Sequence, residues 1–331
     1  MKQNHWLGIL VLFMLGGCVE HQVAIQSTTP SPLLIPQSVV STSMPIPTQT
    51  AIPLPLVAPV ALSAKEVKDL VFALLEDNGN CQLPCLWGLT PGKTDSQTLG
   101  KFLLQFDNLK TPDIYMDVAD FGGIGGFFLG YRENNIHVNT DFFYYEDDEK
   151  KQVLLLGFHG YAMQEHGKDL DWLSLDVSPL YGDDSFNQAF KYYLLPQILS
   201  NYGRPSQVLL APFLNDPDRP DIEWYPFSLV LLYPEDGIFV EYVMPRNKIE
   251  DKFVGCPSQA TINLAVWESE SGLPIEYVIQ KGGAEINELN MEYFKPLAQA
   301  TKMTLDEFYE IFQHPDNTTC LQTLMELWPG P

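Results

Sequence analysis

The sequence predicts an α+β fold built from two units, each consisting of helices followed by antiparallel strands. Three observations support this prediction. Helix-start signals precede apolar residues at helical spacing. Runs rich in aromatic and β-branched residues, bounded by turn residues, are typical of strands. Both kinds of segment occur in the same order twice along the chain. We therefore expect a first α+β unit at 63–170 and a second at 171–331, which together could form a tandem repeat.

The first unit is expected to begin with two helices joined by a cysteine-containing loop. Ser63-Ala64-Lys65-Glu66 has the form of a capping box, in which the serine and glutamate side chains satisfy free backbone amides at a helix start. A second such box is expected from Thr94 to Gln97. Aromatic and β-branched runs then predict strands at 127–131, 136–145 and 152–158, with the acidic run 146–149 at a hairpin tip.

The second unit repeats this order. Ser185 is expected to cap a helix that Pro196 breaks and that ends at Gly203. Strands are predicted at 206–210, 224–233, 238–243 and 262–267, the last of which would close the second sheet. A capping box from Thr304 to Glu307 begins another helix, and a final helical turn is expected within 319–328.

The first eighteen residues have the pattern of an export leader. Lys2 precedes an uncharged apolar run, Trp6 to Leu15, which is too short to span a bilayer but suits a signal peptide. Leu15-Gly16-Gly17-Cys18 then resembles the lipobox of bacterial lipoproteins: an aliphatic residue, two small residues and a cysteine. The resemblance implies a signal peptide at 1–17, cleavage before Cys18, and fatty acyl chains such as palmitate on that cysteine. It also implies an extracytoplasmic protein on the outer face of the cytoplasmic membrane or on the outer membrane.

Residues 18–62 are expected to form a disordered tether between the lipid and the folded units. Eight prolines occur among Ser, Thr, Gln and aliphatic residues, and no Asp, Glu, Lys or Arg lies between Glu20 and Lys65. Proline lacks an amide donor and fixes φ, so this segment favours extended, partly polyproline II backbone.

Two short motifs in the folded part resemble small outer-membrane assembly lipoproteins and β-lactamase-inhibitor proteins. In those proteins Gly-x-Thr opens a helix, and Leu-Gly-x-Pro leads from the helices to the sheet. Gly92-Lys93-Thr94 matches the first motif, and Tyr202-Gly203-Arg204-Pro205 approximates the second, with Tyr in place of Leu. The resemblance implies a repeat of helices and antiparallel strands.

Four cysteines remain when Cys18 carries lipid, and an exported protein can form disulfides. Three pairings are possible. The local pairing is Cys81 with Cys85, which leaves Cys256 with Cys320. The alternative is a thiol or copper protein in which Cys81 and Cys85 act with His159 or His166.

Composition and motifs argue against several classes of function. The net charge of −23 disfavours binding to nucleic acid and suits solubility, cation binding or a basic partner. The sequence has no nucleophile elbow, zinc-protease motif, Walker loop or dinucleotide fingerprint, so we expect no enzyme and no cofactor. Asp216, Asp218 and Asp221 lack the glycine and glutamate of an EF-hand loop, so we predict no metal site.

Tryptophans provide the remaining candidate for ligand contact. Trp87, Trp172, Trp224 and Trp267 could each stack on a sugar ring. Trp224 and Trp267 lie in apolar strands and are expected in the core, whereas Trp172 lies among aspartates and is the one expected to be exposed. We therefore expect a non-enzymatic envelope lipoprotein that binds another envelope protein or serves structurally. The alternative is a solute- or glycan-binding lipoprotein that uses Trp172.

Overall fold

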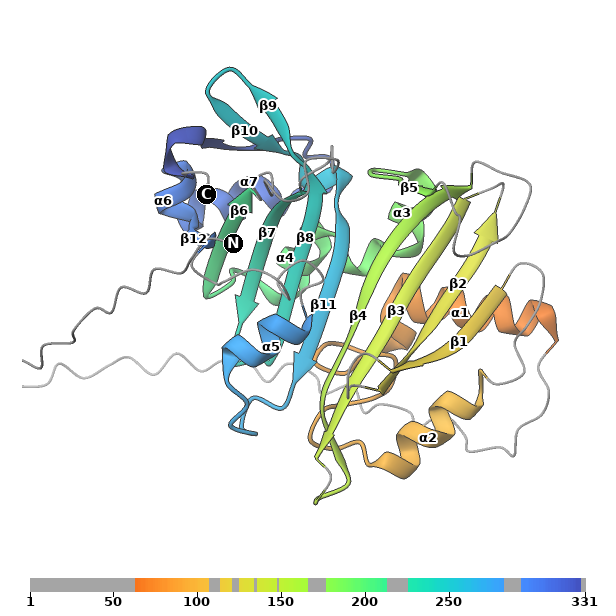
Figure 1. Ribbon diagram of the computed structural model, residues 1–331. Coiled ribbons are helices and arrows are strands. Elements are labelled where there is room, and N and C mark those ends of the chain that lie inside the picture. The colour runs from red at the N-terminus through yellow and green to blue at the C-terminus, as the bar shows by residue number, and fades with distance from the viewer. Residues whose placement is uncertain are drawn as a thin grey trace, which may run out of the picture. The chain divides into compact units, whose positions relative to one another are not determined.

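The computed structural model describes residues 63–106, 114–120, 125–133, 136–147, 149–165, 177–212, 226–282 and 293–328 (Figure 1). The predicted signal peptide, Cys18 and the tether lie outside these residues. The described residues all belong to one compact unit, 51–331. They contain helices and antiparallel sheets, which confirms the predicted α+β class.

The α-helices are distributed along the whole described chain. They are α1 (Ala64–Asp77), α2 (Ser96–Leu104), α3 (Asp184–Ala189), α4 (Leu195–Tyr202), α5 (Ile275–Gly282), α6 (Leu297–Thr301) and α7 (Leu305–Phe312). Short 3-10 turns are η1 (Asn78–Asn80), η2 (Lys191–Tyr193), η3 (Pro257–Gln259) and η6 (Met325–Leu327).

Most strands belong to one ten-stranded sheet, in the order β1-β2-β3-β4-β11-β8-β7-β6-β12, with β5 paired to β4. Their bounds are β1 (Ile114–Asp120), β2 (Gly125–Glu133), β3 (Ile136–Asp147), β4 (Gln152–Glu165), β5 (Val177–Pro179), β6 (Gln207–Pro212), β7 (Pro226–Tyr233), β8 (Ile238–Pro245), β11 (Thr261–Trp267) and β12 (Lys295–Pro296). A three-stranded sheet contains β9 (Asn247–Ile249), β10 (Lys252–Gly255) and β13 (Leu321–Leu324), in the order β13-β10-β9.

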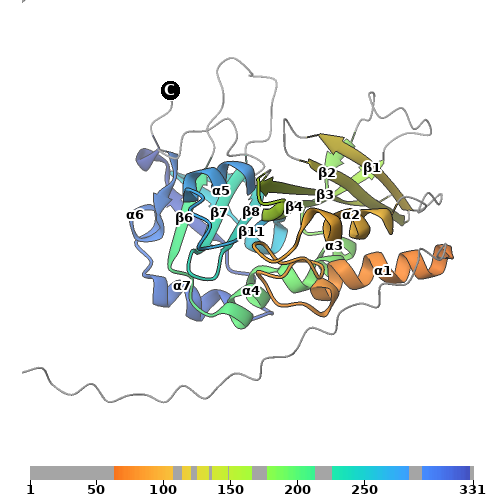
Figure 2. The same ribbon diagram turned by 90° about the horizontal axis from the view of Figure 1, so that it is seen from below.

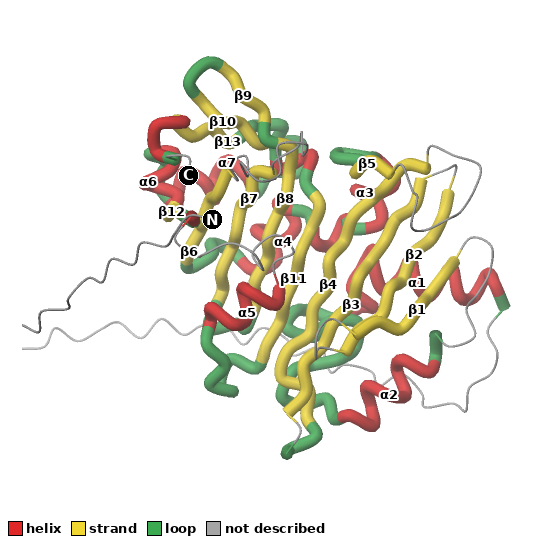
Figure 3. Tube along the Cα trace, viewed as in Figure 1, coloured by secondary structure: helices red, strands yellow, loops and turns green. Residues whose placement is uncertain are grey.

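The strands expected in the two predicted units lie side by side in the large sheet (Figure 3). The predicted strand at 262–267 is β11. This strand lies between β4 and β8, inside the sheet rather than at one of its edges. Residues 155–160 of β4 pair antiparallel with residues 262–267 of β11, so this ladder joins the β1–β4 half to the β6–β8 half.

Side chains that accept hydrogen bonds from free backbone amides mark the starts of α1, α2, α3 and α7. The capping boxes at Ser63 with Glu66 and at Thr304 with Glu307 are both formed, as predicted. The expected caps of α2 and α3 are wrong: Asp95 and Asp183, rather than Thr94 and Ser185, accept the first free amides. An aspartate carboxylate also interacts favourably with the positive end of the helix dipole. The helical turn expected within 319–328 is η6, and the strand β13, which was not expected, precedes it.

The large sheet has two differently covered faces (Figures 1 and 2). The first face packs against helices on both sides of the β4–β11 ladder, through side chains such as Leu74 of α1, Phe102 of α2 and Phe308 of α7. Among the described helices, α5 covers part of the second face, where Val278 and Ile279 contact residues including Phe239 and Ala265. Alternate residues of the central strands β4, β11, β8 and β7 therefore serve two separate apolar cores.

Asn78 connects the end of α1 to the cysteine-containing loop. Its fully buried side-chain amide donates to the carbonyl oxygens of Cys81 and Cys85, each at 2.8 Å. Its Oδ1 accepts from the backbone amide of Trp87 at 3.0 Å and from the Tyr193 hydroxyl at 2.9 Å. Asn78 also has φ of 57°, a backbone conformation that asparagine tolerates better than most residues. The Asn78 side chain thus forms hydrogen bonds with four groups: two backbone carbonyls, one backbone amide and one tyrosine hydroxyl.

Replacing Tyr193 with phenylalanine tests this network. The Trp87 indole donates to the Tyr193 hydroxyl at 3.0 Å, and both side chains are buried. Tyr193→Phe leaves that indole N–H without its partner, so we expect the free energy of unfolding to fall by about 1–3 kcal/mol. Chemical denaturation measures it. Tyr293→Phe, at a side chain that is 47% exposed, is the control and should leave stability unchanged.

The two disulfides should contribute unequally to stability. Cys81–Cys85 and Cys256–Cys320 have sequence separations of 4 and 64 residues. In the chain-entropy description, the longer loop is worth about 4 kcal/mol and the shorter about 2 kcal/mol. The double variant Cys256→Ser/Cys320→Ser should therefore melt well below Cys81→Ser/Cys85→Ser in thermal denaturation. Equal melting temperatures would contradict the loop-length argument.

Candidate functional site

The four predicted cysteines form the predicted pairs, Cys81–Cys85 and Cys256–Cys320. The first closes the loop that Asn78 holds, and the second links the residue after β10 to the residue before β13. The thiols that a redox or copper site would need are thus oxidised in this structure. His159 lies on β4, and His166 lies outside the described residues.

The other sequence candidates fall into two groups. Cys18, Trp172, Trp224 and the three aspartates Asp216, Asp218 and Asp221 lie outside the described residues. Trp87 and Trp267 are core residues, 1% and 5% exposed. Trp87 stacks on Phe158 and Phe142, at 5.9 and 5.1 Å between ring centroids. These two tryptophans therefore stabilise the fold and offer no ring face to a sugar.

A row of polar side chains crosses the second face of the large sheet. Asp141 of β3 is directly opposite His159 of β4, His159 is opposite Asn263 of β11, and Asn263 is opposite Glu241 of β8. Ser228 of β7 lies diagonally beside Glu241. We call these five residues the polar row. It crosses the β4–β11 ladder.

Hydrogen bonds connect four members of the polar row. Glu241 accepts from the Ser228 hydroxyl at 2.8 Å and from the Asn263 amide nitrogen at 2.7 Å. Asn263 Oδ1 lies 3.1 Å from His159 Nδ1. Ser228 and Glu241 are fully buried and Asn263 is 3% exposed, whereas His159 is half-buried. The chain of hydrogen bonds thus runs from a buried carboxylate to a partly accessible imidazole.

This chain determines the tautomer of His159. The Asn263 amide nitrogen faces Glu241 and donates to its Oε2. Asn263 therefore presents its oxygen to His159, and Nδ1 of the imidazole must carry the proton. Nε2 is left with a lone pair, and it has no hydrogen bond within the described part of the chain. An uncharged imidazole in this state can accept a proton, a hydrogen bond or a metal ion.

Asp141 lies beside this imidazole in a partly buried position. The Tyr161 hydroxyl donates to Asp141 Oδ1 at 3.2 Å. Burial raises the pKa of Asp141 to about 7, although the hydrogen bond from Tyr161 acts in the opposite direction. Burial lowers the pKa of His159 to about 4, against the effect of its bond to Asn263. Both side chains are therefore uncharged in mildly acidic solution.

Sequence reasoning did not find the polar row. Its members come from five strands and share no motif. The one signal is a polar residue within an apolar strand, as with Glu241 in Ile238–Pro245 and Asn263 in Thr261–Trp267. That signal marks single positions, and only the strand order and register bring them together.

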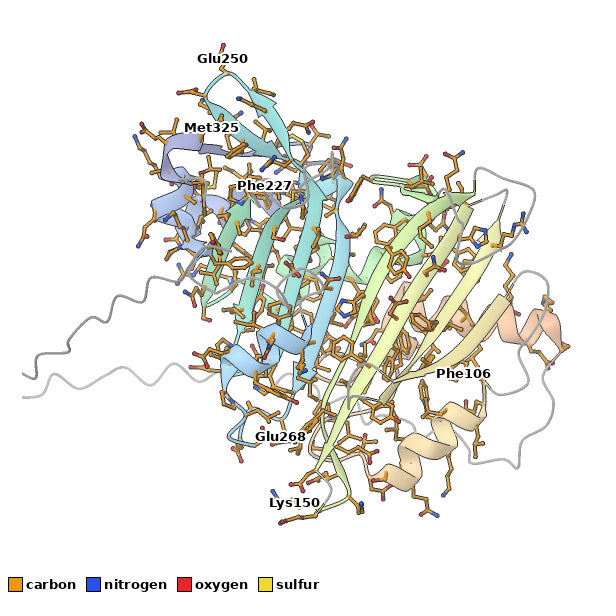
Figure 4. The ribbon with its side chains drawn as sticks, viewed as in Figure 1. Phe106, Lys150, Phe227, Glu250, Glu268 and Met325 are labelled. Atoms are coloured by element: carbon orange, nitrogen blue, oxygen red, sulfur yellow. A yellow bond between two sulfur atoms is a disulfide. The ribbon has the colours of Figure 1, made fainter. Side chains whose placement is uncertain are left out.

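A surface hollow of about 290 Å³ lies between the β9–β10 hairpin and η6, lined by Lys248, Glu250, Asp251, Met325 and Glu326. Figure 4 shows Glu250 at the tip of that hairpin, with its side chain directed away from the body of the protein. The hollow is shallow and carries charges of both signs, so it indicates no particular ligand.

Comparisons with protein-family models, curated proteins and solved structures find no match to this chain. Within the described ranges, no three His, Cys, Asp or Glu side chains gather closely enough to hold a metal ion. No described helix combines the length and apolar character needed to cross a membrane.

The opposite pKa shifts of Asp141 and His159 predict compensating effects on stability. The folded state keeps a proton on Asp141 between about pH 4 and 7 that the unfolded chain releases, so this contribution is lost as pH rises. His159 is neutral in the folded state but protonated in the unfolded chain below about pH 6.5, so its contribution is lost as pH falls toward 4. In the native chain the two contributions largely cancel.

Single substitutions should expose each contribution. Asp141→Asn should lose stability as pH falls from 6.5 to 4.5, and His159→Gln should lose stability as pH rises over that range. Each change should be on the order of 2 kcal/mol, allowing for partial solvent screening. Denaturation in EDTA-containing buffer, compared with the native chain at each pH, measures both slopes. Parallel pH profiles for the two variants would show that these groups do not titrate as described.

Proposed function

We propose that this chain is a membrane-anchored extracytoplasmic lipoprotein, held by acyl chains on Cys18, with a non-enzymatic role in the cell envelope. The folded domain would bind another envelope protein or serve structurally. The membrane contact is made through the lipid, and nucleic acid is not a partner. The chain is thus expected on the outer face of the cytoplasmic membrane or on the outer membrane.

The cysteine distribution carries this proposal. All four cysteines after Cys18 are paired in disulfides, and structural disulfides are typical of exported proteins. Cys18 is the fifth cysteine of the chain, and it follows an apolar leader and two glycines in the register of a lipobox. The folded domain and the leader therefore favour the same compartment on independent grounds.

Charge supports a protein partner rather than direct adhesion to lipid. Removal of a leader whose only charged residue is Lys2 changes the net charge from −23 to −24. A surface of that charge is repelled by anionic headgroups and nucleic acids and attracts basic partners. A tether of about forty residues would separate the domain from the membrane.

A solute- or glycan-binding role is the second candidate. The half-buried side chains of Asp141, His159 and Tyr161 favour it, because polar groups beside aromatic rings suit hydrogen-bonding ligands. Trp172 is the further contact that the sequence suggests for such a ligand. Retention on immobilised glycans, lost in Asp141→Asn, would favour this second role.

The lipid anchor is tested by Cys18→Ser. The substitution removes the thiol that would be acylated, and two or more acyl chains are needed for stable membrane attachment. We expect the native chain in the membrane fraction. The variant should appear either as a soluble protein or as a precursor that retains its leader. Mass spectrometry of the mature amino terminus should find acylated Cys18. Cys81→Ser/Cys85→Ser is the control, and it should remain acylated and membrane-bound. An unmodified Cys18 in the native chain would refute the anchor.

A further inference from the structure

His159 is held in one orientation by its surroundings on the second face of the sheet. Its Nδ1 donates to Asn263, and its ring stacks on Phe143 with centroids 5.1 Å apart and an interplanar angle of 29°. Gly157 makes room for this stacking, because a Cβ at that position would overlap the Phe143 ring. The imidazole is thus fixed on two sides, and no described residue forms a hydrogen bond with its Nε2 lone pair.

Asp141 is placed to share a ligand with His159. The two residues are directly opposite each other on β3 and β4. The Cβ atoms of such a pair lie about 4.5–5.5 Å apart on the same face of a sheet. A carboxylate oxygen and an imidazole nitrogen can therefore reach one common atom above the two strands.

Each of these groups also has the supporting hydrogen bond that is usual for a metal ligand. A metal-binding histidine donates its second ring N–H to an acceptor, which fixes the tautomer and makes the ligand nitrogen more basic. His159 does so through Asn263, which is itself bonded to the buried Glu241. A ligating carboxylate is in turn hydrogen-bonded, as Asp141 is by Tyr161.

We propose that His159 Nε2 and the Asp141 carboxylate bind a divalent transition-metal ion such as Zn²⁺. One nitrogen and one carboxylate oxygen form a ligand set that suits borderline ions better than Ca²⁺ or Mg²⁺. The described residues provide no third His, Cys, Asp or Glu at this position, so water or a group from a partner completes the coordination. The site is consequently open, and it binds more weakly than a closed structural zinc site.

Asn263 and Glu241 are positioning residues in this proposal. They orient the imidazole without touching the ion. The proposal does not depend on the lipid anchor or on the identity of a protein partner. Failure of the Cys18→Ser experiment and failure of metal binding are therefore separate results.

Isothermal titration calorimetry with ZnCl₂ tests the site, using the untagged full chain in detergent after removal of metals with chelator. We expect a saturable binding event in the native chain that His159→Gln abolishes. Asp141→Asn should weaken it by at least about tenfold, because a ligand is replaced by a poorer donor. The matched controls are His314→Gln and Asp316→Asn, which change the same residue types at exposed positions and should leave binding unchanged.

Circular dichroism and thermal melting establish that each variant is folded. If His159→Gln does not fold, the affinity of Asp141→Asn decides the question. Absence of binding in the native chain at submillimolar Zn²⁺, or unchanged binding in a folded His159→Gln or Asp141→Asn, would overturn the proposal. The polar row would then be a hydrogen-bond network of the sheet only.

Discussion

The pairing of β4 with β11 is the constraint on which the rest of the fold depends. It joins strands from the two halves of the chain into one sheet, so the helices of both halves can cover one continuous first face. Its register is strongly specified. A shift of one residue would direct His159 and Asn263 into the apolar core of the first face and Phe158 and Leu264 out of it. The bond between His159 and Asn263 spans this ladder, so the candidate site and the junction of the two halves share the same residues.

The helical layer depends on a second, more local constraint. Asn78 holds the loop between Cys81 and Cys85 against the end of α1, and that loop contacts the later helices through tyrosine hydroxyls. The Tyr202 hydroxyl accepts from the Leu83 amide at 2.9 Å, and the Tyr192 hydroxyl donates to the Cys81 carbonyl at 3.1 Å. Segments more than one hundred residues apart are therefore connected by neutral hydrogen bonds as well as by apolar packing. One surface ion pair adds to this connection: Lys191 Nζ of η2 lies 3.1 Å from the Glu76 carboxylate of α1.

Local patterns predicted much of the fold. The capping boxes at Ser63 and Thr304, the central strands and the Cys81–Cys85 pair follow from signals within a few residues, and the structure contains them. The Cys256–Cys320 pair followed as the remainder once the local pair was assigned. The short strands β9, β10 and β12 were not predicted, because two to four residues carry too little periodicity. The pairing of β11 with β8 agrees with the expected second sheet, whereas its pairing with β4 was not predicted, because strand order is a long-range property. The polar row was missed for the same reason: no local pattern shows that residues 141, 159, 241 and 263 are neighbours.

The sequence separation across the β4–β11 ladder affects how the chain can fold during synthesis or export. Residues 155–160 of β4 gain their second neighbouring strand only when residues 262–267, about one hundred positions later, are available. Until then these residues of β4 present an unpaired backbone edge, which is a template for wrong association. Closing so long a loop is slow compared with forming the β2–β3 and β3–β4 hairpins. A folding factor that shields this edge would therefore be most useful while the second half of the chain is still emerging.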